Sequence, residues 1–306
     1  MIPVVDLAPY SLLGTEKEVD TSTLRKLAEE ICHAFQDVGF VYLKNHGIPE
    51  QLISDVFTSS KTFFEQSEEI KQKYAIPRGE FHGYISFEEE KVNHDRPVSD
   101  AREGYTMLVA KDGTLPKNMP PEISSTFKEM YITCTKLAWR ILDLLSTGLN
   151  KDREYLRQFH RGICVEGNNT MLRSNYYPPL KEIKKDQARC GEHSDYGTIT
   201  FLFQDDVSGL EAKGPSDGYH PVPPVEGTIV MNIGDMMQRW SADRLKATKH
   251  RVVVPQEDKD REKTRQSISF FVVPDDDAII TCTDGSDKYP PIRCLDYVKT
   301  NFDANF

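Results

Sequence analysis

The chain has 306 residues, of which 28% are charged, and its formal net charge is −10 at pH 7. A nucleic-acid-binding face needs an excess of basic residues to neutralise phosphates, so this balance argues against a nucleic-acid partner. The sequence has no stretch of about 18 apolar residues and no secretory leader, so we expect a cytoplasmic protein without a membrane partner.

The first half of the sequence predicts helices. Apolar residues recur every three or four positions over 24–38, which is typical of one buried helix face, and Gly39 ends this helix. A short strand follows at 39–43, and a second amphipathic helix follows Pro49. The longest helix is predicted over 123–145, and we expect it to be the spine of the fold.

From about residue 170 the pattern changes to short β-branched and aromatic runs separated by Gly, Pro and Asp. The predicted strands are 170–177, 198–203, 228–233, 247–254, 266–273 and 278–282. Many short strands with turn signals between them favour a sheet that closes on itself, as in a jelly roll. The charged run 256–263 is then expected to be a hairpin loop rather than a domain boundary.

We therefore predict an α+β fold with a jelly-roll core and a helix-rich N-terminal region packed on it. Residues 1–110 would form the N-terminal region, 111–165 the spine helices and 166–306 the β-barrel, within one compact unit. The six cysteines are scattered without a C-x-x-C pair, so we expect reduced thiols that pack in the core.

A candidate metal site starts at His193-Ser194-Asp195. On an extended backbone, residues two apart point to the same face, so His193 and Asp195 can converge on one ion. Taken alone, this pattern often arises by chance, and a solvated turn is the ordinary alternative. A third ligand would have to come from another strand.

His250 is the candidate third ligand, because it lies in an alternating apolar run later in the chain. A set of two histidines and one carboxylate leaves other coordination positions open, which suits non-haem Fe(II) chemistry with dioxygen. Structural zinc prefers a closed set of four ligands. For His250 alone, a satisfied histidine inside the barrel is the alternative.

Two strand faces carry candidate anion-binding side chains. Arg265 and Ser267 share a face, so a guanidinium fork and a hydroxyl can grip one carboxylate at the barrel floor. Arg173, Asn175 and Tyr177 share a face of an earlier strand. An inward arginine is costly unless an anion meets it, and a solvent-facing strand surface is the alternative.

Together these residues stand in motifs that resemble one enzyme family. In the second half the motifs are Asn175-Tyr-Tyr-Pro-Pro179, His193-x-Asp195, Ile233-Gly-Asp-Met-Met-Gln-Arg-Trp-Ser241, Lys249-His-Arg-Val252 and Arg265-x-Ser267. In the first half they are Ile2-Pro-Val-Val-Asp6, Gly39-Phe-Val-Tyr-Leu-Lys-Asn-His-Gly-Ile-Pro49, Phe63-Phe64 and Glu68-Glu69-Ile-Lys71. In this order and spacing they resemble the isopenicillin-N-synthase-like branch of the 2-oxoglutarate/Fe(II) dioxygenases, over nearly the whole chain.

The resemblance implies a double-stranded β-helix fold, an Fe(II) site, and 2-oxoglutarate and O2 as co-substrates. The implied metal ligands are His193, Asp195 and His250. The implied 2-oxoglutarate site is Arg265 and Ser267 at the distal carboxylate, with Asn175 and Tyr177 assisting. The implied reaction is hydroxylation or another oxidation of a small organic metabolite, with release of succinate and CO2.

Three further positions bear on the resemblance. His46 stands in the family's Asn-His-Gly signature, and we expect it to be structural. Ala242 stands where many members have Asn, and Ala247 stands where Ser is common. Neither alanine is at a ligand position, so these departures concern loop geometry rather than metal binding.

The predicted substrate pocket surrounds the mouth of the site. Its candidate residues are Arg173, Arg102, Tyr84, Tyr105, Phe271 and Phe302. Two cations around an otherwise aromatic cavity favour a small, flat or partly apolar molecule with an anionic or strongly hydrogen-accepting group. For Arg102 the alternative is a surface salt bridge with Glu103 or Asp100.

Two other functions are compatible with the motifs. The first is an oxidase of the same fold that uses Fe(II) and O2 without 2-oxoglutarate. The second is a non-catalytic protein that binds a small acid. In each case we expect a monomer whose partner is a small molecule, and substrate identity depends on variable loops that the motifs do not describe.

Overall fold

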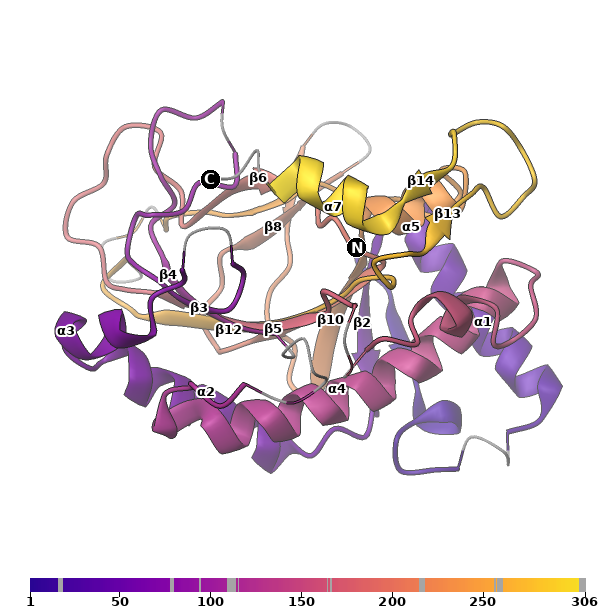
Figure 1. Cartoon of the computed structure of the whole chain (residues 1–306), viewed down its shortest axis with the longest axis horizontal. Coiled ribbons are helices and arrows are strands. Elements are labelled where there is room, and N and C mark those ends of the chain that lie inside the picture. The colour runs from indigo at the N-terminus through magenta and orange to yellow at the C-terminus, as the bar shows by residue number, and fades with distance from the viewer. Residues whose placement is uncertain are drawn as a thin grey trace.

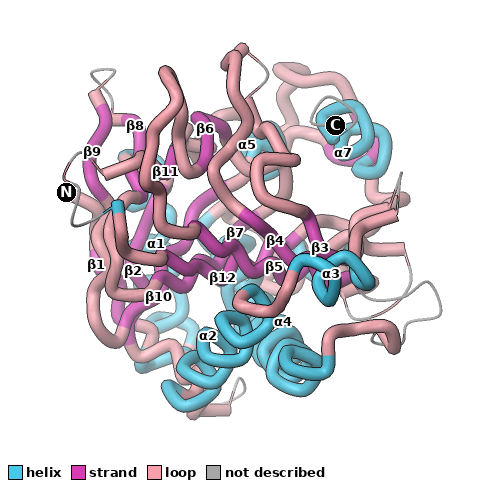
Figure 2. The backbone as a smooth tube through the Cα atoms, turned by 90° about the vertical axis from the view of Figure 1, so that its left-hand side faces the viewer, coloured by secondary structure: helices cyan, strands magenta, loops and turns pink. Residues whose placement is uncertain are grey.

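The structure is a computed structural model with two facing sheets and a helical layer. It describes residues 1–15, 19–77, 80–93, 95–108, 114, 116–163, 165, 167–214, 218–255, 257 and 261–302, with side chains to residue 300. Figure 2 shows the helical layer on one side of the larger sheet and the smaller sheet on the other side.

The helices are α1 (Thr21–Asp37), α2 (Glu50–Phe64), α3 (Glu68–Lys71), α4 (Pro121–Gly148), α5 (Asp235–Trp240) and α7 (Cys294–Phe302). Short 3-10 turns lie at Ala8–Tyr10, Gln72–Tyr74 and Leu156–Phe159. The predicted spine is α4, the long helix along the lower side of Figure 1. Within the described residues, no helix is long and apolar enough to cross a bilayer.

The larger sheet has the strand order β1 (Val4–Asp6), β2 (Phe40–Lys44), β10 (Thr228–Ile233), β7 (Ile199–Gln204), β12 (Arg265–Val272), β5 (Met171–Tyr177), β4 (Glu103–Leu108) and β3 (Gly83–Ile85). The smaller sheet has the order β6 (Cys190–His193), β11 (His250–Val252), β8 (Leu210–Lys213) and β9 (Tyr219–Pro221). A separate pair consists of β13 (Ile279–Ile280) and β14 (Ile292–Arg293).

The helical layer follows from caps and apolar stripes in the sequence. Asp20 caps α1, because its carboxylate accepts the backbone N–H groups of Ser22 and Thr23, each at 3.0 Å. Pro121 begins α4, where its fixed φ suits the first helical turn. The buried stripe of α4, which includes Phe127, packs against α1, α2 and the strands β5 and β12. The helices therefore pack on the outer face of the larger sheet and cover it.

Most predicted strands form, but the hairpin prediction for 256–263 is wrong. The strand before this run, β11, pairs with β6 and β8, whereas the strand after it, β12, pairs with β5 and β7. The run therefore connects the two sheets, although residues 256 and 258–260 lie outside the described part. Crossing from one sheet to the other places Arg265 and His250 on facing walls.

Gly39 is required at the end of α1. Its φ is +76°, and a Cβ there would lie 2.3 Å from Thr248 Oγ1 and 2.4 Å from the Lys246 carbonyl oxygen. The Thr248 hydroxyl instead donates to the Val38 carbonyl at 2.6 Å. The segment that leads into His250 is thereby fixed against the end of the helix.

Candidate active site

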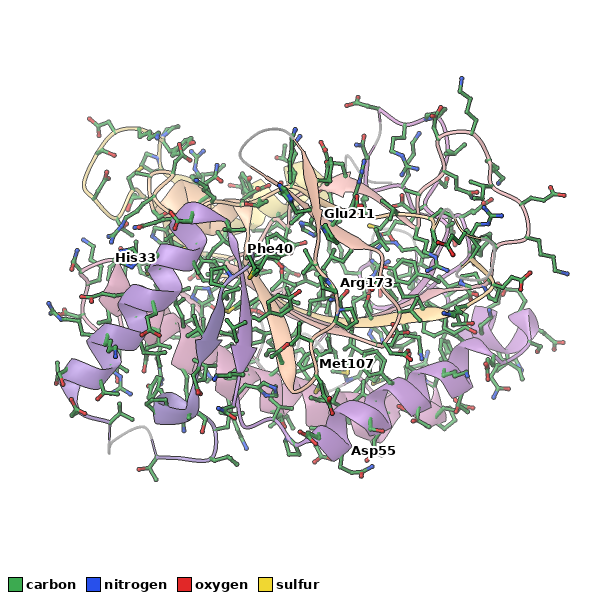
Figure 3. All side chains as sticks on the ribbon, turned by 180° about the vertical axis from the view of Figure 1, so that it is seen from behind. His33, Phe40, Asp55, Met107, Arg173 and Glu211 are labelled. Atoms are coloured by element: carbon green, nitrogen blue, oxygen red, sulfur yellow. The ribbon has the colours of Figure 1, made fainter. Side chains whose placement is uncertain are left out.

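A cavity of about 160 Å³ lies between the two sheets, with room for roughly ten water molecules. Figure 3 shows Arg173 and Phe40 in the interior, while His33 and Asp55 lie at the outer surface of the helical layer. The residues predicted from the sequence that line the cavity are His193, Asp195, His250, Arg265, Ser267, Asn175, Tyr177, Arg173, Arg102 and Phe271.

His193, Asp195 and His250 converge at one end of this cavity. His193 and His250 are partners in the β6–β11 ladder, and Asp195 follows two residues after β6 ends. The Nε2 atoms of both histidines lie 3.8 Å from Asp195 Oδ1. One ligand atom from each of the three residues lies within 4.8 Å of the others, which is a suitable spacing around one metal ion.

Backbone hydrogen bonds fix which nitrogen of each imidazole faces the cavity. His193 Nδ1 lies 2.9 Å from the Gly191 carbonyl oxygen, and His250 Nδ1 lies 3.1 Å from the Thr248 carbonyl oxygen. Because a carbonyl oxygen only accepts, each Nδ1 carries a proton, and Nε2 is the nitrogen that faces the metal position. Burial lowers the pKa of His250, so its imidazole is neutral near pH 7.

Asp195 is held by one carboxylate oxygen and leaves the other for a cation. Its Oδ2 accepts hydrogen bonds from the Thr200 hydroxyl and from Asn232 Nδ2, both at 2.6 Å. Burial would raise the pKa of Asp195, but the two histidines and these hydrogen bonds outweigh it and keep the pKa below its usual value. The carboxylate and the two imidazoles form an open set of three ligands on one side.

The Ile233-Gly-Asp motif has a packing reason in this site. A Cβ on Gly234 would lie 2.2 Å from the Gly197 carbonyl oxygen, so only glycine permits this approach. The approach lets the backbone N–H of Asp235 donate to the Asp195 carbonyl at 2.7 Å. The start of α5 thus braces the turn that carries Asp195.

Arg265 lies at another wall of the cavity with an unused hydrogen-bond donor. Its Nη2 donates to Gln204 Oε1 at 2.8 Å and its Nε to the Val207 carbonyl at 3.1 Å. Its guanidinium carbon lies 4.9 Å from the centre of the Tyr177 ring. Nη1 is buried and has no hydrogen-bond partner in the part of the chain that the structure describes. Ser267 follows on the same strand face and also lines the cavity, and a guanidinium beside a hydroxyl suits one carboxylate.

Sequence reasoning missed a second buried arginine near this wall. Arg189 precedes β6, is fully buried, and donates from Nη2 to the Lys263 carbonyl at 2.9 Å. Its Nε and Nη1 have no partner among the described residues. Burial and the positive charge of Arg265 lower its pKa. No motif marks Arg189, so the sequence carries no signal for it.

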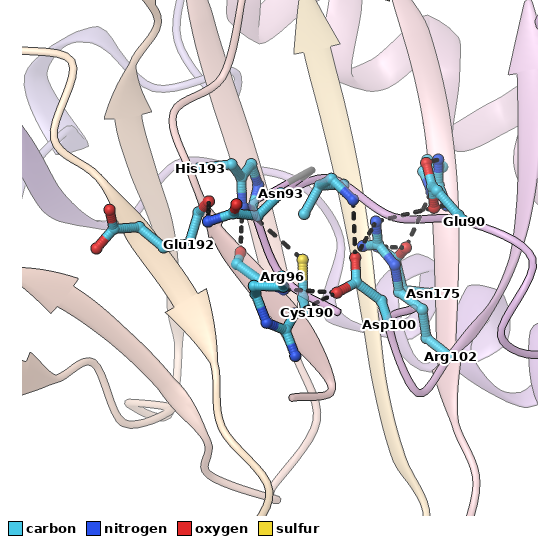
Figure 4. A network of polar contacts seen from close by, with 12 residues as sticks. Glu90, Asn93, Arg96, Asp100, Arg102, Asn175, Cys190, Glu192 and His193 are labelled. Carbon is cyan, nitrogen blue, oxygen red and sulfur yellow. Dashed lines mark hydrogen bonds and ion pairs between the residues drawn. The ribbon is translucent and has the colours of Figure 1, made fainter. Parts of the chain in front are cut away.

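Arg173 and Arg102 line the cavity, but a buried carboxylate already pairs with both. Arg102 Nη2 lies 2.8 Å from Glu90 Oε2 (Figure 4). Arg173 Nη1 lies 3.0 Å from Glu90 Oε1. Burial would raise the pKa of Glu90, but Arg102 and Arg173 outweigh it and lower the pKa to about 2. The prediction of two free cations is therefore wrong, because Glu90 was not recognised from the sequence.

Tyr84 and Tyr105 do not line the cavity, which corrects the predicted substrate pocket. They are partners in the β3–β4 ladder and therefore share one face of the sheet. On that face both rings pack edge-to-face against Phe63 of α2. The Tyr84 hydroxyl donates to Glu103 at 2.5 Å. Both tyrosines belong to the core beneath the larger sheet.

The C-terminal segment contributes to the cavity through another residue than the one predicted. The side chain of Phe302 lies outside the described residues, whereas Val298 on α7 lines the cavity. Tyr196, next to Asp195, also lines the cavity and was not predicted. The expected structural histidine, His46, does not line the cavity, and its Nδ1 accepts the Ile48 N–H at 3.1 Å.

Comparisons with known proteins agree with this geometry. The family model described as the 2OG-Fe(II) oxygenase superfamily matches residues 168–274, and the one described as non-haem dioxygenase in morphine synthesis N-terminal matches residues 2–123. The 2-oxoglutarate-Fe(II) type oxidoreductase ppzD of Metarhizium rileyi is 30% identical over 277 residues, which cover 83% of this chain and 77% of that protein. The chain belongs to the 2OG-Fe(II) oxygenase superfamily.

A solved structure extends the similarity to the fold. A full-length Neurospora crassa protein, crystallised in complex with alpha-KG and thymine, has a TM-score of 0.85 at 30% identity, covering 99% of this chain and 96% of that one. The proline hydroxylase buaE of Petromyces alliaceus is 30% identical over 263 residues, which cover 81% of both chains.

These similarities confirm the predicted jelly-roll fold and the enzyme class. This oxygenase uses Fe(II), with 2-oxoglutarate and O2 as co-substrates, and oxidises a small organic molecule. The comparisons therefore favour a 2-oxoglutarate-dependent oxygenase over the two alternatives, an oxidase that does not use 2-oxoglutarate and a non-catalytic protein that binds a small acid.

Proposed function

We propose that His193, Asp195 and His250 bind the Fe(II) of this oxygenase. The support is their shared orientation, with two imidazole lone pairs and one ionised carboxylate oxygen facing a common point. When bound there, iron and 2-oxoglutarate couple the oxidative decarboxylation of 2-oxoglutarate by O2 to oxidation of a substrate C–H bond. The chain's part is to keep the three ligands aligned.

Arg265 and Ser267 hold the distal carboxylate of 2-oxoglutarate in this proposal, with Tyr177 and Asn175 beside it. The observation that carries it is the buried Arg265 Nη1, which lacks a partner in the described part of the chain. A buried, unpaired donor is costly, and a carboxylate would satisfy it with a charge-assisted hydrogen bond. Gln204 and Val207 hold the other two nitrogens, so the fork is already oriented.

The substrate occupies the remaining part of the cavity, near Arg173 and Phe271. A cavity of about 160 Å³ that also holds 2-oxoglutarate leaves space for a small molecule only. The names of relatives give different substrates, thymine in one complex and proline in one enzyme name, so similarity alone does not choose between them. The side chains around Phe271 exclude water and hold the substrate against the metal end.

Turnover of 2-oxoglutarate tests the proposal. Purified protein with Fe(II), 2-oxoglutarate and air should release succinate slowly without substrate, and faster when a metabolite library supplies the substrate. His193→Ala and Asp195→Ala should abolish succinate release while circular dichroism shows an intact fold. His33→Ala, at an exposed position on α1, is the matched control and should keep full activity. Full activity in either ligand variant would contradict the assignment.

The cytosol is the compartment that the composition favours, and a monomer is the simplest active form. The five described cysteines are free and buried, which suits a reducing compartment. All residues assigned to the site come from one chain, so a partner chain is not required to complete it. Sedimentation at low and high protein concentration, compared with activity, tests the second statement.

A further inference from the structure

Asp100 is a fully buried carboxylate at the end of the segment that connects β3 to β4. Its backbone N–H donates to the Glu90 carbonyl at 3.0 Å, and the N–H of Ala101 donates to the Ala188 carbonyl at 2.9 Å. The first bond closes the segment on itself, and the second ties it to the chain just before β6. Asp100 therefore has a fixed position beside the strand that carries His193.

The side chain of Asp100 accepts a hydrogen bond from β6 itself. Its Oδ1 accepts the backbone N–H of Gly191 at 2.8 Å, and it also accepts Arg96 Nη1 at 2.9 Å (Figure 4). Its Oδ2 accepts the Val92 N–H at 3.2 Å and lies 3.8 Å from Arg102 Nη2. Asp100 does not line the cavity, so any effect on the site passes through these neighbours.

Gly191 connects Asp100 to a candidate metal ligand. The Gly191 carbonyl accepts the hydrogen bond from His193 Nδ1 at 2.9 Å, while the Gly191 N–H donates to Asp100. Both backbone polar groups of Gly191 are thus engaged, one with the carboxylate and one with the imidazole. Rotation of the Gly191 backbone would turn the carbonyl away from His193, and the bond to Asp100 opposes that rotation.

The β6–β11 ladder is irregular at this point, so it does not fix Gly191 by itself. The register places two β6 residues, 191 and 192, opposite the single residue 251, as in a β-bulge. A bulge disrupts the ladder locally, and here side chains from the segment before β4 bind the bulged residues. Asp100 accepts the N–H of Gly191, and Asn93 Nδ2 donates to the Glu192 carbonyl at 3.2 Å.

The close approach of this segment to β6 requires glycine at position 191. A Cβ there would lie 2.7 Å from Arg96 Nη1 and 3.1 Å from Asn93 Cβ. A larger residue would push the segment away from β6 and lengthen the bond between Asp100 and the Gly191 N–H. The packing and the hydrogen bond therefore depend on each other.

We infer that Asp100 is a positioning residue for the metal site: it holds the Gly191 N–H and thereby fixes the carbonyl that orients His193. The inference rests on the proposed function, because it requires His193 to be a metal ligand. The acceptor oxygen carries this role, rather than the negative charge. Asparagine at position 100 keeps an acceptor for the Gly191 N–H, whereas alanine does not.

Metal binding without turnover tests the inference, with Co(II) as the probe because its d–d spectrum reports the arrangement of its ligands. Titration of the metal-free full-length chain gives the dissociation constant, and visible circular dichroism gives the spectrum of the bound ion. Asp100→Ala should weaken Co(II) binding about 10- to 100-fold and change the spectrum. Asp100→Asn should bind Co(II) within about threefold of the wild type and keep its spectrum. Both variants remove the charge opposite Arg96 and Arg102, so the acceptor alone distinguishes them.

Asp143→Ala is the matched control, because Asp143 on α4 is also fully buried and pairs with two arginines, Arg153 and Arg157, each at 2.8 Å. It does not line the cavity, so Asp143→Ala should lose stability in urea unfolding but bind Co(II) like the wild type. If Asp100→Ala does not fold, Asp100→Leu fills the space without an acceptor and should show the same weakening.

Three results would overturn the role of Asp100. They are unchanged Co(II) binding when the acceptor is removed, a tenfold loss in Asp100→Asn, and an equal loss in Asp143→Ala. Equal Co(II) binding by His193→Ala and the wild type would instead contradict the proposed function. The wild-type spectrum in Asp100→Asn, together with an altered one in the variant that lacks the acceptor, would support the inference.

Discussion

His193 and His250 lie opposite each other in the β6–β11 ladder, with ring centroids 4.3 Å apart and both Nε2 atoms directed toward Asp195. A hydrogen bond from Nδ1 to a backbone carbonyl on its far side orients each ring. The proposed metal site is thus built from strand register and two backbone contacts. Its affinity should depend as much on the groups behind the ligands as on the ligands.

The hydrogen bonds behind Asp195 give the first prediction. Asn232→Leu removes the 2.6 Å bond to Asp195 Oδ2 and should weaken Fe(II) binding about 10- to 100-fold. Asp195→Glu should weaken it more, because an added methylene displaces the carboxylate from the two histidines. Competition with a chromophoric chelator measures both affinities. Equal affinity of Asn232→Leu and wild type would show that Thr200 alone suffices to orient the carboxylate.

Arg265 gives the second prediction. Arg265→Lys replaces a fixed guanidinium fork by a single ammonium group, so 2-oxoglutarate should bind more weakly. The binding free energy should fall by about 2 to 5 kcal/mol. Calorimetry on the anaerobic iron complex measures this change. Arg244→Lys, at an exposed position, is the control and should bind 2-oxoglutarate like the wild type. An unchanged dissociation constant for Arg265→Lys would place the carboxylate elsewhere.

The placement of the candidate metal ligands and of Arg265 and Ser267 in one cavity was predictable, because it depends on short periodic patterns. Arg265 and Ser267 share a strand face through the two-residue period, and that period holds in β12. The same rule, applied to β4, would have corrected the substrate pocket. Arg102 and Tyr105 are three residues apart near one strand, so their side chains point to opposite faces, and only Arg102 reaches the cavity.

Glu90 and Arg189 were not predictable in the same way. Glu90 meets Arg173, 83 residues later, through a loop whose path no local pattern determines. Arg189 precedes its strand, and its burial depends on how the segment around Lys263 folds over it. Contacts of this kind require the tertiary structure, because neither propensity nor spacing encodes which loop covers which strand.

Tyr84 and Tyr177 give a matched pair for the third prediction. Tyr84→Phe removes a buried hydrogen bond to the Glu103 carboxylate and should lower the free energy of unfolding by about 1 to 2 kcal/mol. It should leave 2-oxoglutarate binding unchanged, because Tyr84 faces the helical layer. Tyr177→Phe should weaken 2-oxoglutarate binding instead. Urea unfolding measures the first effect and calorimetry the second. Weaker 2-oxoglutarate binding by Tyr84→Phe would show that Tyr84 contributes to the binding pocket.

His160 gives a prediction about pH. Burial lowers its pKa to about 4, and its ring lies 2.7 Å from the Leu156 carbonyl and 2.8 Å from the Thr198 hydroxyl. Between pH 6.5 and 4 the unfolded chain therefore binds a proton at this residue that the folded chain does not. Stability should be lost on acidification through this window, at about 1.4 kcal/mol per pH unit for each such histidine.

The variant His160→Gln isolates this contribution. Glutamine can keep both hydrogen bonds but does not titrate, so the metal-free variant should lose stability less steeply than the wild type between pH 7 and pH 5. Urea unfolding at each pH gives the two slopes. Identical slopes would mean that His160 is protonated in the folded protein or that its pKa is not lowered.

Ala242 gives the last prediction, at a position where the family resemblance already marked a departure. Its φ is +53°, in the left-handed region that costs residues with a Cβ about 1 to 2 kcal/mol, and that Asn tolerates better than other residues with a side chain. Many members have Asn at this position, and the Ala242 carbonyl here accepts a hydrogen bond from Lys288 Nζ at 3.2 Å. The loop therefore keeps the conformation that suits Asn.

Ala242→Asn should raise the free energy of unfolding by about 0.5 to 1 kcal/mol, because Asn reaches the same backbone conformation with less strain. Ala242→Val should lower it, since a β-branched side chain is the least compatible with a positive φ. Both changes leave the cavity lining untouched, so 2-oxoglutarate binding should stay constant in each variant. Equal stability of the Asn and Val variants in urea unfolding would show that backbone strain at this position is negligible. The loop would then accept different side chains at position 242 without a change in stability.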